Sequence, residues 1–451
     1  MKKVNRCRAC GSSALTPAFS LDGMTTARRA GRKPASVDYA ICDGAKDAFA
    51  CGLLQRVKMD RRPQPDAAPS ATYRSTRSHL RAIATEALEL ISGRDCCALD
   101  IGCNDGTLLS FYPRWVDRHG VDVDAIVEGV GEWAWTAQAA FPSAELDRAL
   151  GEKKFDIVTA VSILEKISEP RAFFARMKSL LTPDGVIVIE TLYTPMALAR
   201  TGVDAFASGA EALYSLGVLE RMARDCDLKI FRGALTDKDG GSIRLFLTHS
   251  DVSDYDFDPW YERLARLWDE ENALALRSVQ SYQAFENRSD AARADFHGLL
   301  AELHERGETA HLLSAGPQAV ALYRWAGKMA HVITAAVDEK PPLNGAYLCE
   351  YGPVVISETD CRAAEPEYLL APASLKREML ERWREAIILG AKMIIATPTP
   401  HIVDASNFAV EFGKSIAGGD NPGEVETLRA ILTAAGGPRL VAVSGGQKKT
   451  G

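Results

Sequence analysis

Apolar runs of strand length alternate with helical stretches through the middle of the chain. Such runs occupy residues 97–101, 156–161 and 186–190, and a stretch with helical spacing of apolar residues follows each of them. Apolar residues also recur at helical spacing from 78 to 90, which predicts a helix ahead of the first run. This series is typical of βαβ units, so the sequence predicts a doubly wound parallel sheet of the α/β class.

A second alternation follows toward the C-terminus. Residues 259–307 are rich in Glu, Arg, Ala and Leu, which predicts long amphipathic helices that form a bridge. Beyond them the pattern predicts a strand at 311–315, a helix at 318–327, a strand at 332–338 and a helix that runs into a strand at 386–396. This order predicts a second, Rossmann-like α/β domain.

Breaks in the pattern divide the chain. Residues 1–60 are punctuated by Gly and Cys without helical periodicity, and the Pro-rich stretch at 61–69 disfavours regular structure. A Gly-rich tail with one predicted helix at 424–435 follows His401. We therefore predict five segments: a small cysteine-bearing domain at 1–69, an α/β domain at 70–255, a helical linker at 256–308, a second α/β domain at 309–404 and a tail at 405–451.

Composition and charge narrow the classes of function. The chain has 451 residues, enough for about two to four domains of ordinary size. Its 53 Lys and Arg residues against 60 Asp and Glu residues give a net charge of -7, so we expect no nucleic-acid partner. The first residues lack the apolar core of a signal peptide, and no apolar run approaches the roughly 20 residues that cross a bilayer. We therefore expect a soluble, cytoplasmic protein without a membrane partner.

The strongest chemical signal is a glycine motif after the first apolar run. Asp100, Gly102 and Gly106 give the pattern acidic-x-Gly-x-x-x-Gly between a strand and a helix. Glycines let a backbone approach a ligand closely, and amides at a helix start receive a carboxylate. Asn104 stands where a dinucleotide fingerprint needs glycine, and the pattern resembles the motif of class I S-adenosylmethionine methyltransferases. On that interpretation Asp100 lies under the methionine ammonium, and Asn104 and Asp105 line the loop. A turn without a ligand is the alternative.

Two further acidic residues follow in the order that this fold requires. Asp122 ends the next short strand, where a carboxylate would accept hydrogen bonds from both ribose hydroxyls. Asp147 is the candidate contact of the adenine amino group. Each residue alone is more often a surface carboxylate, but their order after Asp100 supports S-adenosylmethionine as the cofactor.

Further motifs carry a resemblance to a family. Besides the glycine motif they comprise the segments 7–11, 21–24, 51–55, 73–76, 240–244, 337–340 and 398–400. With these in order, residues 7–404 resemble the sugar C-methyltransferases of deoxysugar pathways. The resemblance implies a zinc-binding N-terminal domain, a central class I methyltransferase domain and a C-terminal α/β domain. Members of that family methylate C3 of a dTDP-4-keto-deoxysugar.

Four cysteines in the first 51 residues are the candidate metal ligands. Cys7 and Cys10 have the spacing of a zinc knuckle, and tetrahedral zinc takes four nitrogen or sulfur ligands. Where the family has a second Cys-x-x-Cys, Ala48 replaces its first cysteine and Cys51 matches its second. Cys42 is the nearest substitute, across an inserted loop. We therefore predict zinc on Cys7, Cys10, Cys42 and Cys51, with a degraded site or buried thiols as the alternatives.

The family's catalytic region is not present. Its Tyr-His-Glu-His run aligns with residues 207–210, which read Ala-Ser-Gly-Ala, and Lys166 and Asp239 stand where the family has two further histidines. Proton removal from C3 of a keto sugar requires a general base, so we predict no appreciable C3 methylation of a dTDP-4-keto-deoxysugar. Alignment alone can lower a barrier by about 7–11 kcal/mol, so a pocket poor in bases can still methylate an amine, thiolate, carboxylate or acidic carbon.

The candidate catalytic residues are Tyr73, Glu190, Tyr193 and Tyr214, of which the first three match family positions. A packing or surface role is the alternative for each. We expect an S-adenosylmethionine-dependent methyltransferase that acts on a small molecule, such as a nucleotide sugar or another natural-product intermediate. Cyclisation or elimination at the same cofactor site, and a non-catalytic partner subunit, are the alternative functions.

Overall fold

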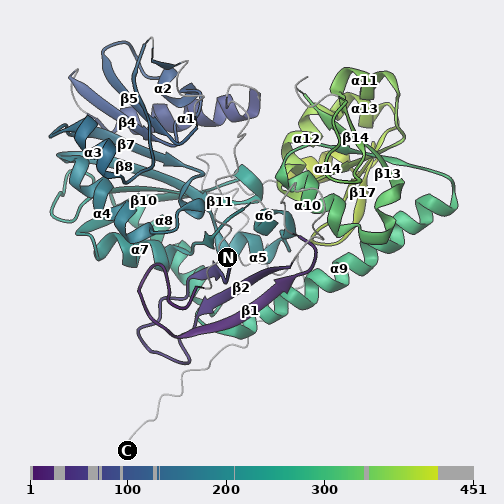
Figure 1. Cartoon of the computed structure of the whole chain (residues 1–451), viewed down its shortest axis with the longest axis horizontal. Coiled ribbons are helices and arrows are strands. Elements are labelled where there is room, and N and C mark those ends of the chain that lie inside the picture. The colour runs from purple at the N-terminus through teal and green to yellow at the C-terminus, as the bar shows by residue number, and fades with distance from the viewer. Residues whose placement is uncertain are drawn as a thin grey trace, which may run out of the picture.

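The computed structural model describes residues 4–24, 36–58, 70, 74–91, 95–124, 130–131, 133–207, 209–339 and 345–414. Within these residues the chain forms three β-sheets with helices packed around them (Figure 1). Tyr73, the Pro-rich stretch at 61–69 and the predicted helix at 424–435 lie outside the described residues. Among the helices that the structure describes, none is long and apolar enough to cross a membrane.

The central sheet contains the strands predicted from the apolar runs. Its members are β4 (Cys96–Ile101), β5 (Val116–Asp122), β6 (Trp135–Gln138), β7 (Phe155–Val161), β8 (Leu181–Leu192), β10 (Leu228–Thr236) and β11 (Ser242–His249). They lie in the order β10-β11-β8-β7-β4-β5-β6, and β4, β7 and β8 pair in parallel as expected. The sheet is not wholly parallel, because β11 pairs antiparallel with both of its neighbours, β10 and β8.

Helices accompany the strands of the central region along the chain. They are α1 (Arg74–Glu89), α2 (Thr107–Ser110), α3 (Ala144–Leu150), α4 (Pro170–Leu180), α5 (Thr194–Ala199), α6 (Val203–Ala207) and α7 (Leu216–Arg224). The first of them confirms the helix predicted at 78–90. Leu80 and Ile83 of α1 belong to the same buried cluster as Val186 and Val188 of β8, so α1 packs on one face of the sheet.

The cysteine-bearing N-terminal segment forms an antiparallel sheet. It contains β1 (Leu15–Leu21), β2 (Val37–Cys42), β3 (Leu54–Arg56) and β9 (Ala212–Leu213). The last of these strands comes from the central region, so segments far apart in the sequence complete one sheet. Next to this pairing, Arg8 and Glu211 form a largely buried ion pair of 3.1 Å. The N-terminal segment is therefore anchored to the central region.

A third sheet confirms the second α/β unit. Its strands, in spatial order, are β14 (Val354–Ser357), β13 (Ile333–Asp338), β12 (Ala310–Leu313), β15 (Tyr368–Ala371), β16 (Lys392–Ile395) and β17 (His401–Val403). All neighbours pair in parallel except β16 and β17. The accompanying helices are α10 (Pro317–Trp325), α11 (Glu358–Ala363), α12 (Lys376–Arg382), α13 (Arg384–Ile388) and α14 (Phe408–Gly413).

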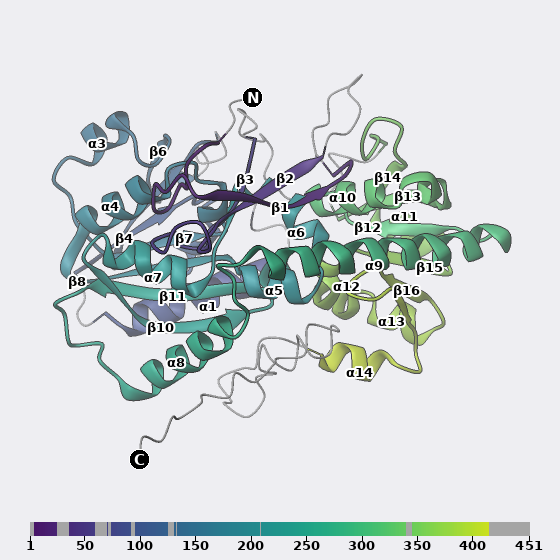
Figure 2. The same cartoon turned by 90° about the horizontal axis from the view of Figure 1, so that it is seen from below.

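Two helices occupy the predicted bridge, α8 (Asp258–Asn272) and α9 (Val279–Glu305). The second runs along β1 and on to the third sheet (Figure 2). Phe285 of α9 packs against Phe19 of β1 and Phe206 of α6, with ring centroids 4.8 and 5.1 Å apart. One aromatic cluster thus ties the bridge to the N-terminal sheet and to the central region.

Candidate functional site

The glycine motif forms a tight loop at the carboxyl end of β4. Gly102 and Gly106 have φ angles of 78° and 72°, in the left-handed region that glycine favours. A Cβ atom at Gly102 would lie 2.8 Å from Cδ1 of Ile163, and one at Gly106 would lie 2.7 Å from Cγ1 of Val130. The loop therefore needs glycine for its backbone conformation and for its close packing.

Asp100 is buried in β4 directly before this loop. The hydroxyl of Thr159 in β7 donates a hydrogen bond of 2.6 Å to its Oδ1. Burial raises the pKa of Asp100 to about 7; the Thr159 hydroxyl opposes this rise, and the charge of Asp122 adds to it. Within the part of the chain that the structure describes, no positive charge contributes to the pKa of this carboxyl.

The neighbouring predicted residues lie around the same strand end. Asp122 accepts hydrogen bonds from the backbone N–H groups of Asn104 at 2.8 Å and Asp124 at 3.0 Å. Its two oxygens each keep a lone pair that can accept a further hydrogen bond. Asp105 accepts a hydrogen bond of 2.6 Å from the hydroxyl of Thr107 in α2. The structure thus brings the predicted residues from 100 to 122 together.

Asp147 is the predicted cofactor residue that does not join this group. It lies in α3, and its Oδ1 is 2.8 Å from Nε of Arg176 in α4. About half of its side chain is exposed, so the contact is a surface ion pair. Its role at the adenine stays a prediction.

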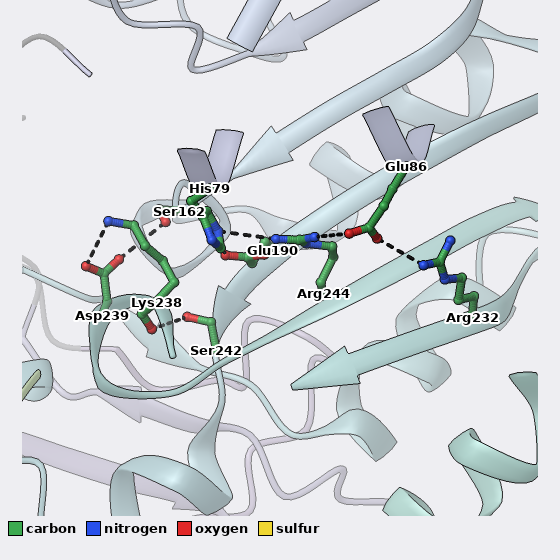
Figure 3. A network of polar contacts seen from close by, with 9 residues as sticks. All are labelled: His79, Glu86, Ser162, Glu190, Arg232, Lys238, Asp239, Ser242 and Arg244. Carbon is green, nitrogen blue, oxygen red and sulfur yellow. Dashed lines mark hydrogen bonds and ion pairs between the residues drawn. The ribbon is translucent and has the colours of Figure 1, made fainter. Parts of the chain in front are cut away.

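A buried ionic network lies near the carboxyl end of β8 (Figure 3). The strand register places it on the same face of the sheet as Asp100. Asp100 pairs with Thr159, and Thr159 pairs with Val188. Residues two apart on a strand point to the same face, so Glu190 shares that face. The Glu190 side chain is fully buried, and Nε of Arg244 in β11 donates a hydrogen bond of 2.7 Å to its Oε2.

His79 of α1 is the second partner of Glu190, with Nε2 at 2.5 Å from Oε1. Burial opposes ionisation of Glu190, but the charges of His79 and Arg244 outweigh it and hold the pKa of Glu190 at about 2. Arg244 also pairs with Glu86 of α1 at 2.7 Å, and Glu86 pairs with Arg232 of β10 at 3.1 Å. The network therefore joins α1 to three strands.

Sequence reasoning missed His79. It considered only positions where the family places its histidines, and the expectation of a pocket poor in bases stays a prediction. His79 lies instead on the helix before the glycine motif. A signal exists in the sequence: His79 and Glu86 flank the buried Ile83 at helical spacing, so two titratable side chains share the apolar side of α1.

Two of the predicted catalytic tyrosines are fully buried. The hydroxyl of Tyr193 donates a hydrogen bond of 2.8 Å to Glu271 of α8. The hydroxyl of Tyr214 donates to the carbonyl oxygen of Leu164 at 3.4 Å. Both hydroxyls therefore have partners within the protein core, which favours the packing alternative, and their catalytic role stays a prediction.

The turn η4 (Lys238–Gly240) joins β10 to β11 beside the network (Figure 3). Asp239 lies 3.4 Å from Nζ of Lys238, and its other oxygen accepts a hydrogen bond of 3.4 Å from the hydroxyl of Ser162. The charge of Asp239 raises the pKa of Lys238 against the effect of burial. Glu378 of α12 adds to that rise, so the second α/β unit contributes charge to the same edge.

The four N-terminal cysteines form a compact cluster. Their sulfur atoms all lie within 4.8 Å of one another. The Sγ atoms of Cys7 and Cys51, and those of Cys10 and Cys42, are 3.5 Å apart. Thiolates at about 2.3 Å from a tetrahedral zinc ion are about 3.8 Å from one another, so the donor set and its spacing fit zinc.

Comparisons with known proteins match two parts of the chain. Residues 73–231 match a family described as a methyltransferase domain, and residues 237–398 match one described as the C-methyltransferase C-terminal domain. An uncharacterized methyltransferase of Mycobacterium bovis is 31% identical over 106 residues, which are 22% of this chain and 52% of that protein. The ubiquinone biosynthesis O-methyltransferase of a Bradyrhizobium species is 28% identical over 114 residues, 24% of this chain and 45% of that protein. The chain thus spans about half the length of these curated relatives.

Among solved structures, the CcbJ methyltransferase of Streptomyces caelestis matches 42% of this chain and 100% of its own, with 15% identity and a TM-score of 0.32. The family matches show that the chain carries a methyltransferase domain with the class I fold. They also show a C-terminal region of the kind found in C-methyltransferases, which begins at the η4 turn.

Proposed function

We propose that this protein transfers a methyl group from S-adenosylmethionine to a small-molecule acceptor, such as a nucleotide sugar or another natural-product intermediate. The observation that carries the proposal is the state of Asp100. A buried carboxyl whose pKa is raised to about 7 gains from a nearby cation, because a buried charge is costly without a partner. The ammonium of the methionine part of the cofactor is such a cation.

The surrounding residues fit the rest of this molecule. Asp122 has lone pairs available for the ribose hydroxyls, and Gly102 and Gly106 leave the loop backbone without side chains. When bound, S-adenosylmethionine supplies an electrophilic methyl group on a sulfonium. The residues of this chain hold that molecule, orient the acceptor and receive the proton that the acceptor loses.

We place the acceptor next to the residues that follow β7, close to the ionic network. Ile163 lies against Gly102, and the N–H of the preceding Ser162 donates a hydrogen bond of 2.8 Å to the carbonyl of Glu190. This short connection links the glycine loop to the network. Arg200, Asp239 and Ser374 are among the residues that line a small pocket where the central region meets the second α/β unit. The central region and the second α/β unit therefore both border this pocket.

Cofactor binding is tested first, by calorimetry and by mass spectrometry of the purified protein for S-adenosylmethionine or its demethylated product. We expect wild-type protein to bind S-adenosylmethionine and Asp100→Asn to bind it at least tenfold more weakly. The exposed Asp254→Asn serves as the matched control. No binding by the wild-type chain, or equal affinity in both variants, would refute the assignment.

Methyl transfer is tested with methyl-labelled S-adenosylmethionine and four acceptor probes: a dTDP-4-keto-6-deoxysugar, catechol, tyramine and dithiothreitol. The position of the labelled methyl group in each product, assigned by NMR, identifies the acceptor atom as carbon, oxygen, nitrogen or sulfur. Breakdown of the cofactor without a labelled product would favour elimination or cyclisation instead. The proposal therefore has an outcome that separates it from its main alternative.

We also propose that Cys7, Cys10, Cys42 and Cys51 hold one structural zinc ion. Protein purified without added metal should contain one zinc per chain, and the Cys7→Ser/Cys10→Ser double variant should contain none. Cys226→Ser, which lies outside the cluster, should keep its zinc. Because such sites contribute folding energy, zinc loss should unfold the N-terminal sheet first. Full zinc in the double variant would contradict the assignment.

A further inference from the structure

We propose that His79 accepts the proton that the methyl acceptor loses, and that Glu190 positions the imidazole ring for this step. The inference rests on the proposed function, because a methyl acceptor exists only if methyl transfer takes place. His79 would supply the proton acceptor that the family's histidines do not supply in this chain, and it comes from a different element of the fold.

The hydrogen-bonding partner of His79 fixes its tautomer. Glu190 is ionised at neutral pH, so its carboxylate can only accept hydrogen bonds. Its Oε1 lies 2.5 Å from Nε2 of His79, so this nitrogen carries the hydrogen in the neutral ring. The lone pair is then on Nδ1. An acidic residue orients a proton-accepting histidine by the same logic in the catalytic triad of serine proteases.

The His79 ring lies between the buried Glu190–Arg244 pair and the partly exposed side of the network. In the part of the chain that the structure describes, Nε2 of the ring donates to Glu190 at 2.5 Å. Nη2 of Arg244 lies 3.4 Å from the same nitrogen, and because a guanidinium only donates, this second approach is a contact without a hydrogen bond when Nε2 carries the hydrogen. The His79 side chain is 19% exposed, whereas that of Glu190 is 0% exposed. His79 therefore covers the carboxylate with one edge of its ring and leaves the Nδ1 edge for another partner.

Charged groups from several elements lie near the network that contains His79. Lys238 and Asp239 of η4 are drawn beside it in Figure 3, and Glu378 of α12 lies close enough to raise the pKa of Lys238. Glu378 also accepts a hydrogen bond from the hydroxyl of Ser75, one helical turn before His79 on α1. A small polar molecule bound between α1, η4 and α12 would thus meet His79 and several hydrogen-bonding groups.

The chemistry balances with His79 as the proton acceptor. Transfer to an O–H, N–H or C–H acceptor forms a bond from the acceptor atom to the methyl carbon and breaks the bond to hydrogen. The electron pair of the broken sulfur–methyl bond stays on sulfur, and the acceptor's proton passes to Nδ1. His79 enters this step as the neutral ring, and the imidazolium that forms is then stabilised by the ionised Glu190, because their charges attract. The substrate class is therefore a compound whose methylated atom carries a proton.

A purely structural role for His79 would make different predictions. In that case the ring only shields the Glu190–Arg244 pair, and its removal would act like any other break in the network. Glu86→Gln supplies that comparison, because it removes an ion pair of Arg244 and leaves the His79–Glu190 contact in place. Arg77→Gln, at an exposed position of the same helix, is the matched surface control.

The experiment combines a spectroscopic and a kinetic readout on the full chain. Nitrogen-15 NMR of the imidazole should show the Nε2–H tautomer in the neutral ring, and Glu190→Gln should remove that preference. His79→Gln should keep the wild-type affinity for S-adenosylmethionine within about twofold. It should slow labelling of catechol, tyramine or the keto sugar by about 10²–10⁴-fold, the usual contribution of general acid–base catalysis. Glu86→Gln should lower stability but slow labelling by less than about tenfold.

The outcomes separate this inference from the proposed function. An Nδ1–H tautomer overturns it even if none of the probes is methylated. Wild-type labelling rates in His79→Gln overturn it as well, while methyl transfer itself stands. No binding of S-adenosylmethionine by the wild-type chain would instead refute the proposed function, and with it the step assigned to His79.

Discussion

Asp100 and Glu190 are buried carboxylates on one face of the central sheet, yet they titrate in opposite directions. Burial is the largest influence on both and favours the protonated form. At Asp100 the hydroxyl of Thr159 offsets only part of that effect, and the pKa rises to about 7. At Glu190 the charges of Arg244 and His79 exceed it, and the pKa falls to about 2.

The difference lies in the partners that the fold supplies. The charge of Glu190 is already satisfied, so that carboxylate can hold Arg244 and His79 in place before any ligand arrives. The charge of Asp100 has no such partner in the described structure, so a cationic ligand would complete the site. Titratable groups whose surroundings push their pKa values apart often mark distinct chemical roles. This contrast supports the proposed division, with cofactor binding at the end of β4 and acceptor chemistry at the end of β8.

The largest expected effect is on the unfolding free energy and comes from removing the Glu190 carboxylate, whose charge is already paired. Glu190→Ala leaves Arg244 buried with one of its two carboxylate partners missing, and such a break costs about 3–5 kcal/mol of unfolding free energy. Urea denaturation at pH 7 measures it. The double variant Glu190→Ala/Arg244→Met should regain much of the loss, because it removes the unpaired charge as well. A single-variant loss below about 1 kcal/mol would mean that solvent screens the pair.

Replacing Asp100 should instead raise the unfolding free energy. A folded-state pKa of about 7 for Asp100 means that the native state binds more protons than the unfolded state between about pH 4 and 7. Stability therefore falls as the pH rises through that window, by about 1.4 kcal/mol for each pH unit. Asp100→Asn should raise the unfolding free energy of the ligand-free protein by about 2–4 kcal/mol at pH 8, and by little near pH 4. A destabilised variant at pH 8 would break the comparison.

The residues proposed for cofactor binding could be predicted from the sequence, whereas the pairing proposed for the acceptor chemistry could not. Asp100, Gly102 and Gly106 fall within seven consecutive residues, so a strand-to-helix turn alone places them together. The acceptor side combines α1, β8 and β11, and only the packing of that helix on the sheet brings His79 to Glu190. No local sequence pattern specifies how α1 packs on the sheet.

The same distinction applies to the N-terminal region. The pairing of β3 with β9 joins residues about 160 positions apart, and strand pairing over such a separation leaves no periodicity to detect. Cys42 could be proposed as the fourth metal ligand only because the resemblance required one more cysteine. Once β2 ends at Cys42 and the next segment loops out, Cys51 returns to the same place.

A smaller effect, on the affinity for S-adenosylmethionine, should distinguish Asp122 from Asp147. Asp122→Ala should weaken S-adenosylmethionine binding by about 1.5–3 kcal/mol, the usual contribution of hydrogen bonds to a charged group. Asp147→Ala should change the affinity by less than about 0.5 kcal/mol, because its carboxylate forms a surface pair with Arg176. Calorimetry on both variants decides. Equal losses would restore Asp147 as the adenine contact.

The smallest expected signal is a fraction of a proton. With a pKa of about 7, about half of the Asp100 carboxyls are protonated in the free protein at pH 7. A bound ammonium lowers that pKa, so binding should release roughly half a proton per site, and less at pH 8.5, where the group is already ionised. The measurement compares binding enthalpies in phosphate and Tris at each pH. Asp100→Asn should abolish the release, while Glu190→Gln should retain it, because Glu190 is ionised throughout this range. Proton uptake, or a release that does not change with pH, would place the cation elsewhere.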